Sequence, residues 1–186
     1  MAEYYLVSQL PSLDAVGEDI PITEESFMEL CRRFLNKKAV EVLENLTLIP
    51  NIAYTPSGSE LVNKWNEWER DFRLALVKVR AEKLNKPYEQ KDVVLSSELI
   101  KTATIVTSME NPLDAELFLL RMRLSFLETL RPMDTFSQEF LFYYALKLKL
   151  LSRIKGFDST RGEREYRKIY QSILNGDRTE GENDPN

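Results

Sequence analysis

The stretch SELVNKWNEWERDFRLALVKVRAEKL, residues 59–84, decides the fold. Its apolar seam recurs in alternating steps of four and three residues, at Leu61, Trp65, Trp68, Phe72, Ala75 and Val79. This spacing places the seam along one narrow side of an α-helix, as in helical hairpins and coiled coils. Charged side chains occupy the other faces. We therefore expect a long amphipathic helix from Ser59 to Leu84 that packs its seam against other helices, with Trp65 and Trp68 in the core.

Helical patterns with start and stop signals lie on both sides of this stretch. Thr23 is a suitable N-cap, and Asn111 with Pro112 ends one helix and begins the next. The further predicted helices cover residues 23–35, 39–46, 93–107, 112–130, from Asp134 or Thr135 to 154, and from Ser159 or Thr160 to 173. Residues 1–10 fit either a short strand or a helical turn. Because the connections are short, we expect an all-α, antiparallel multi-helix bundle of six to seven helices.

The 186 residues fit a single helical domain over residues 1–175, followed by a disordered acidic tail over residues 176–186. The start of the chain lacks the basic and apolar segments of a signal peptide. No apolar run approaches the roughly 18 residues of a membrane span. These features predict a soluble, cytoplasmic protein.

The composition argues against most catalytic and cofactor chemistry. The chain has no histidine and one cysteine, Cys31, which excludes histidine-based triads and cysteine-rich metal sites and predicts a small core thiol. Its six glycines form no phosphate-binding loop. The acid pairs 114/116 and 163/165 are each two residues apart, so their members face different sides of a helix. We expect no catalytic, cofactor or metal site.

The charge distribution argues against nucleic acid as a partner. The net charge is −5, and the first 30 residues contain acids but neither Lys nor Arg. Such a chain repels phosphate backbones unless it carries a strong basic patch, and none is visible.

Two groups of residues stand out as structural or partner-contact candidates. Glu116 and Arg123 share a polar strip between two apolar stripes, so each is expected to pair with a charge on a neighbouring helix, with Arg73 or Arg80 as candidates for Glu116. The doublets Tyr4-Tyr5 and Tyr143-Tyr144 cannot bury both rings on one face. One tyrosine of each doublet is therefore expected at a surface groove or partner contact.

Several short segments, in the same order, resemble an uncharacterised bacterial family encoded beside the genes of V/A-type ATPases. They are Tyr4-Tyr5-Leu6-Val7 with Leu10-Pro11, Pro21-Ile22 with Phe27, Trp65 to Arg70 with Arg80-Ala81, Asn111 to Glu116, and Tyr144 to Leu148. That family looks like a shortened relative of the socket protein of the V-type ATPase, its C-type or d-type component. The socket protein is all-helical and non-catalytic, and it lies between the rotor shaft and the proteolipid ring.

The resemblance implies a stalk or assembly role in proton or sodium transport. It implies the central stalk proteins and the proteolipid ring as partners, and a cytoplasmic location at the inner face of the membrane through those partners only. It carries over no catalytic residue. Two alternatives stay open at this point: a free-standing helical adaptor or regulator unrelated to the ATPase, and an enzyme that uses only carboxylates, Tyr or Lys.

Overall fold

The computed structural model describes residues 2–13, 20–50, 56–88, 93–155, 164 and 166–171. Its helices are α1 (Ala2–Gln9), α2 (Glu24–Phe34), α3 (Lys37–Glu44), α4 (Glu60–Lys83), α5 (Ser97–Ser108), α6 (Pro112–Thr129) and α7 (Gln138–Lys155). The described residues contain no strand, so the expected all-α class is confirmed.

The chain divides into two compact units, residues 1–152 and 153–186, and the division falls within the single domain predicted over residues 1–175. In the second unit, residues 164 and 166–171 are helical, with Tyr166 and Tyr170 exposed and stacked on each other. The predicted start of this helix at Ser159 or Thr160 and the predicted tail over residues 176–186 lie outside the described residues. All that follows on packing concerns the first unit.

Helix α4 begins and ends at polar backbone signals close to the predicted limits. Ser59 is its N-cap, and the hydroxyl oxygen accepts a hydrogen bond from the Val62 amide at 3.2 Å. At the other end Asn85 adopts a positive φ of 52°. The amides of Asn85 and Lys86 then bond back to the carbonyls of Glu82 and Ala81, which is the Schellman arrangement. The long helix is thus closed by local hydrogen bonds at both ends.

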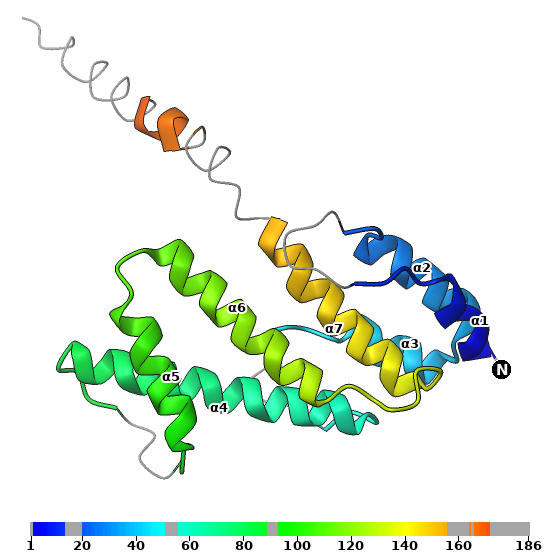
Figure 1. The fold of residues 1–186 in the computed structure, drawn as a ribbon, viewed down its shortest axis with the longest axis horizontal. Helices are drawn as coiled ribbons and strands as arrows, with labels where there is room; N and C mark the ends of the chain where they lie inside the picture. The colour runs from blue at the N-terminus through cyan, green and yellow to red at the C-terminus, as the bar shows by residue number, and fades with distance from the viewer. Residues whose placement is uncertain are drawn as a thin grey trace, which may run out of the picture. The chain divides into compact units, whose positions relative to one another are not determined.

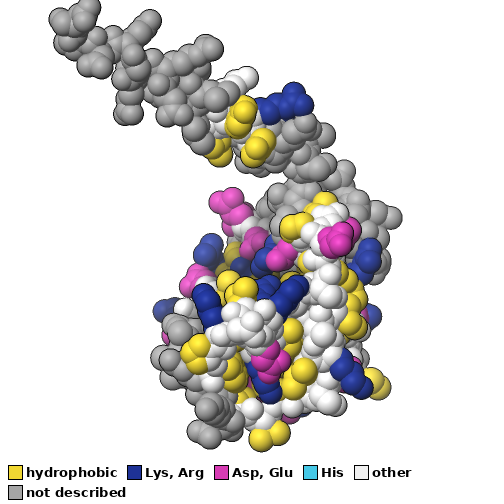
Figure 2. Space-filling model, turned by 90° about the vertical axis from the view of Figure 1, so that its left-hand side faces the viewer, with side chains coloured by type: hydrophobic (Ala, Val, Ile, Leu, Met, Phe, Trp, Pro, Cys, Tyr) yellow, Lys and Arg dark blue, Asp and Glu magenta, His cyan; other side chains and the backbone are white. Residues whose placement is uncertain are grey.

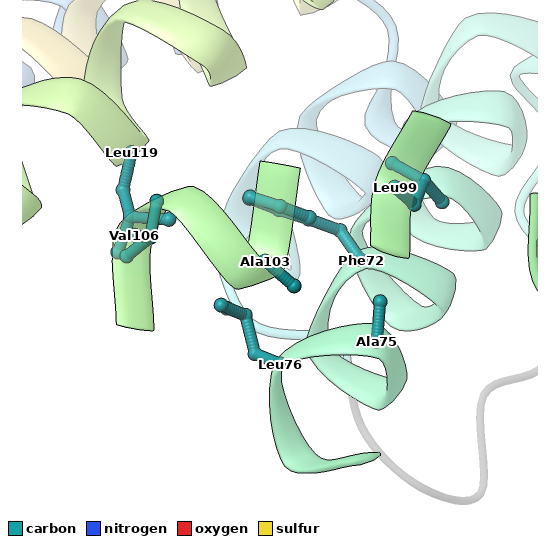
Figure 3. Packing of buried hydrophobic residues seen from close by; sticks show 7 residues of the cluster. All are labelled: Phe72, Ala75, Leu76, Leu99, Ala103, Val106 and Leu119. Atoms are coloured by element: carbon teal, nitrogen blue, oxygen red, sulfur yellow. The ribbon is translucent and has the colours of Figure 1, made fainter. Parts of the chain in front are cut away.

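The predicted seam of α4 faces the core. Trp65, Phe72 and Ala75 are fully buried, whereas Trp68 and Val79 are partly buried at its margin. Helix α5 crosses α4, and its residues Leu99, Ala103 and Val106 meet Phe72, Ala75 and Leu76, with Leu119 of α6 completing the cluster (Figure 3). Each fully buried large side chain contributes about 1.5–3 kcal/mol. This cluster therefore joins three helices into one layer of the first unit.

The remaining helices pack around α7. Helix α1 contacts α2, and α2 contacts α3. Phe27 of α2 stacks on Tyr144 of α7, with ring centroids 5.3 Å apart. Figure 1 shows α4 and α6 running in opposite directions, and α6 and α7 likewise, so these three helices follow the predicted antiparallel order while α5 crosses it.

The first turns of α4 and α7 share one carboxylate. Glu139 Oε2 accepts hydrogen bonds from the Ser59 hydroxyl at 2.8 Å and from the Leu61 amide at 3.1 Å. The negative charge also lies where the α4 dipole is positive. Glu139 therefore acts as a second cap of α4, provided from a helix about 80 residues away in sequence.

Several predicted limits are corrected. Residues 2–9 are helical rather than extended, and the predicted helix 39–46 is α3, which begins two residues earlier behind the Asn36 cap. Helix α5 starts at Ser97 instead of residue 93, because the Ser96 side chain caps it. The turn after Asp134 delays α7 to Gln138, and Ser137 accepts from the Phe140 amide at its start.

Candidate functional site

Aromatic side chains gather on the surface where α1 meets the turn before α7. Tyr4, Tyr5 and Phe136 are 54%, 59% and 45% exposed. The ring of Tyr4 lies 4.7 Å from that of Phe136 and 6.0 Å from that of Tyr5, measured between centroids. Met133, in the same turn as Phe136, is fully exposed. We call Tyr4, Tyr5, Met133 and Phe136 the aromatic patch.

Exposed hydrophobic side chains also occur elsewhere, but singly. Figure 2 shows such side chains lying among Lys, Arg, Asp and Glu side chains on one face of the molecule. Scattered exposure of this kind is ordinary for a folded protein. The aromatic patch differs because its rings contact one another and remain open to solvent, which is typical of interaction sites.

A groove begins beside the patch, one helical turn further along α1. Its volume is about 230 Å³. The residues that line it come from α1 and the segment after it, from the end of α6 and from α7, and include Val7, Leu10, Pro11, Leu13, Arg131, Phe140, Tyr143, Tyr144 and Lys147. Because Tyr4 and Val7 are three residues apart on α1, they lie on the same side of this helix. The patch and the groove therefore border each other.

One side of the groove carries a small charged cluster. Glu128 Oε1 accepts hydrogen bonds from the Tyr143 hydroxyl and from Lys147 Nζ, both at 2.7 Å. Burial raises the pKa of the Glu128 carboxyl, but those two bonds and the charges of Lys147 and Arg131 outweigh burial and hold the pKa below its ordinary value. Glu128 is therefore ionised at neutral pH and lies between two cations.

The tyrosine doublets behave differently from each other. Tyr4 and Tyr5 are both exposed, as a partner contact requires. Tyr143 and Tyr144 are both buried, at 3% and 4% exposure, so the expectation that one of them lies at the surface is wrong. Successive residues of a helix point about 100° apart. Both directions are covered here, because α7 has packed neighbours on either side.

The two buried rings nevertheless take part in the groove through their hydroxyls. Tyr143 bonds to Glu128, as described, and the Tyr144 hydroxyl donates to the Pro11 carbonyl at 2.8 Å. Burial raises the pKa of Tyr144 to about 12, so this hydroxyl remains a donor at neutral pH. The second doublet therefore forms part of the groove floor.

The predicted polar strip contains a buried ion cluster centred on Glu69 of α4. Arg123 of α6 donates to both carboxylate oxygens, with distances of 2.9 Å and 2.8 Å, and Arg73 donates to Oε1 at 2.8 Å. The side chains of Glu69 and Arg123 are 0% and 8% exposed, whereas that of Arg73 is 36% exposed. Arg123 also lies over the Phe72 ring, 5.6 Å from its centroid.

Arg123 thus pairs with an acid on a neighbouring helix, as predicted, but sequence reasoning missed which acid. Glu69 lies four residues after Trp65 and three before Phe72, in the middle of the buried stripe. A carboxylate at such a position requires a buried cation, and this signal was available. Arg73, proposed as a partner of Glu116, bonds to Glu69.

Glu116 is half-buried on α6, and Arg80 is exposed near the end of α4. A pair between them stays a prediction.

Other reactive groups are held apart from the groove. Cys31 is fully buried, and burial raises the pKa of its thiol to about 12, against a small opposing effect of Arg32, so the predicted core role is confirmed. Among the described residues no three acidic, histidine or cysteine side chains are grouped as a metal site would need. Within the same residues, no helix combines the length and apolar content of a membrane span.

The chemistry available at this site is binding: exposed rings, an apolar groove and fixed charges beside it. Comparison of the chain with protein-family models, with curated proteins and with solved structures found no match.

Proposed function

We propose that this protein acts by binding other proteins, as a non-catalytic stalk or assembly component of a V/A-type rotary ATPase. In that role it couples the rotor shaft to the membrane ring during proton or sodium transport. The observation that supports partner binding is the aromatic patch, whose contacting rings stay exposed beside an apolar groove. The ATPase itself is proposed on the family resemblance of the sequence segments.

The physical argument for a binding role starts from the unfavourable exposure of the patch. Tyrosine and phenylalanine rings each bury large areas when covered, and such residues dominate the energetics of protein interfaces. Tyrosine also keeps a polar tip that can bond at the edge of a contact. A rigid patch on helices, next to a groove, therefore offers a partner both area and a position for an anchoring side chain.

Co-purification tests the proposal directly. The full chain is mixed with the purified shaft proteins and, separately, with the detergent-solubilised proteolipid ring of the ATPase from the same cell. We expect it to co-elute with at least one of them. A folded sample that binds neither would refute the ATPase role.

Matched variants test the surface. Tyr4→Ala combined with Tyr5→Ala is expected to weaken co-elution strongly, because it removes two exposed rings of the patch. Tyr166→Ala is the control, since Tyr166 is an equally exposed tyrosine, 67% accessible, outside the patch. Equal binding by all variants would place the contact elsewhere on the chain.

The alternative role is a free-standing helical adaptor unrelated to the ATPase. The same patch would serve it. Specific capture of a different protein, lost in the Tyr4/Tyr5 variant, together with no binding to shaft or ring, would favour this alternative.

A further inference from the structure

We propose that the groove between α1 and α7 binds an acidic, amphipathic segment of the partner protein, with an apolar side chain in the cavity and a carboxylate beside Arg131. This inference rests on the proposed partner-binding role, and not on the identity of the ATPase.

The size of the groove favours a peptide side chain over a cofactor. Its volume of about 230 Å³ is smaller than the pockets of roughly 300–1,000 Å³ that enclose drug-sized ligands. Its apolar lining, with Val7, Leu10 and Phe140, suits one or two aliphatic or aromatic anchors. Anchors from a helix inserted into an apolar groove are a recurrent mode of peptide recognition.

The charges beside the groove select the sign of the ligand. Lys147 and Arg131 line it, and the carboxylate bonded there is Glu128, so two cations share one anion. The Lys147 side chain is only 17% exposed and is held by Glu128, while Arg131 is exposed. One positive charge is left over and Arg131 can reach solvent. A carboxylate on the ligand would complete the cluster.

The rest of the chain makes this positive end distinctive. The protein carries a net charge of −5, and its first 30 residues contain no Lys or Arg. An acidic segment is therefore repelled by most of the molecule and attracted at this end of the groove. Complementary charge of this kind fixes orientation and register more than it adds affinity. The aromatic patch at the other end then receives the apolar residues that follow.

Peptide selection on the intact protein tests the proposal. A display library of random 16-residue peptides is selected on the full chain, and bound clones are resynthesised for fluorescence anisotropy. We expect enriched peptides that carry acids beside spaced apolar residues. Enrichment without an excess of acids, or no enrichment at all, would overturn the inference.

Two variants with opposite expected signs sharpen the test. Arg131→Glu should weaken binding of the selected peptide about tenfold at low salt, and less at high salt. Glu128→Gln keeps an acceptor for Tyr143 while removing the anion, so it should tighten binding severalfold. Arg121→Glu, at an exposed arginine of α6 outside the groove, is the control and should change little.

The outcomes separate this inference from the ATPase role. Thermal melts establish that each variant is folded. Acidic peptides whose binding follows the expected signs, with no co-elution of ATPase components, would support the groove and refute the ATPase. Co-elution that Arg131→Glu leaves unchanged, with peptides that ignore both variants, would support the ATPase role and overturn the groove.

Discussion

Replacing Arg123 by methionine should destabilise the first unit more than most single substitutions. The change leaves the fully buried Glu69 carboxylate without its two bonds from Arg123, and with only the single bond from the half-exposed Arg73. Removing one partner of a buried ion pair typically costs about 3–5 kcal/mol. For a unit of this size, that cost lowers the melting temperature by roughly 10 °C or more. Thermal and urea unfolding followed by circular dichroism measure both quantities.

A double variant tests the physical reason. Glu69→Leu with Arg123→Met removes both charges and keeps apolar volume, so its stability should return to within about 1 kcal/mol of the parent or exceed it. Arg73→Met is the control, because its exposed pair should contribute only about 1 kcal/mol or less. The reasoning fails if Arg123→Met alone is nearly neutral, or if the double variant is no more stable than the single one.

Three further outcomes follow from groups described above. Replacing Glu139 by alanine removes the acceptor shared by two donors at the start of α4 and should cost about 1–3 kcal/mol in urea unfolding, whereas Glu98→Ala on α5 should cost little. Cys31, whose thiol pKa is raised to about 12 by burial, should resist a disulfide reagent in the native protein and react in urea, and fast native labelling would contradict its burial. Because the folded pKa of Glu128 is lowered, its stabilisation is present at neutral pH and is lost as pH falls through that pKa. The stability gap between the parent and Glu128→Gln should therefore close below about pH 4, and a gap that persists in acid would count against the cluster.

The helices could be predicted where local chemistry decides them. The seam from Leu61 to Val79 and the caps at Thr23, Ser59 and Asn111 are features of a few neighbouring residues, and the structure has each of them in place. The starts of α5 and α7 were misplaced because two candidate caps compete in each region, and tertiary packing chooses between them.

The candidate site was harder to predict, since it depends on which helices meet. The tyrosine pattern identified Tyr4 and Tyr5 but not their contact with Phe136, about 130 residues away in sequence. Nor could periodicity show that both sides of α7 are covered, which buries Tyr143 and Tyr144. Glu69 was visible as an acid within an apolar stripe, yet its partner could be identified only once α4 and α6 lay side by side.

The bidentate bond between Glu69 and Arg123 has an evolutionary consequence. A change at either position alone passes through a destabilised intermediate, whereas an exchange of the two charges, or a joint change to apolar residues, does not. In any homologue with the same helix packing, positions 69 and 123 should therefore vary as a correlated pair. An alignment in which they vary independently would mean that α4 and α6 tolerate other registers.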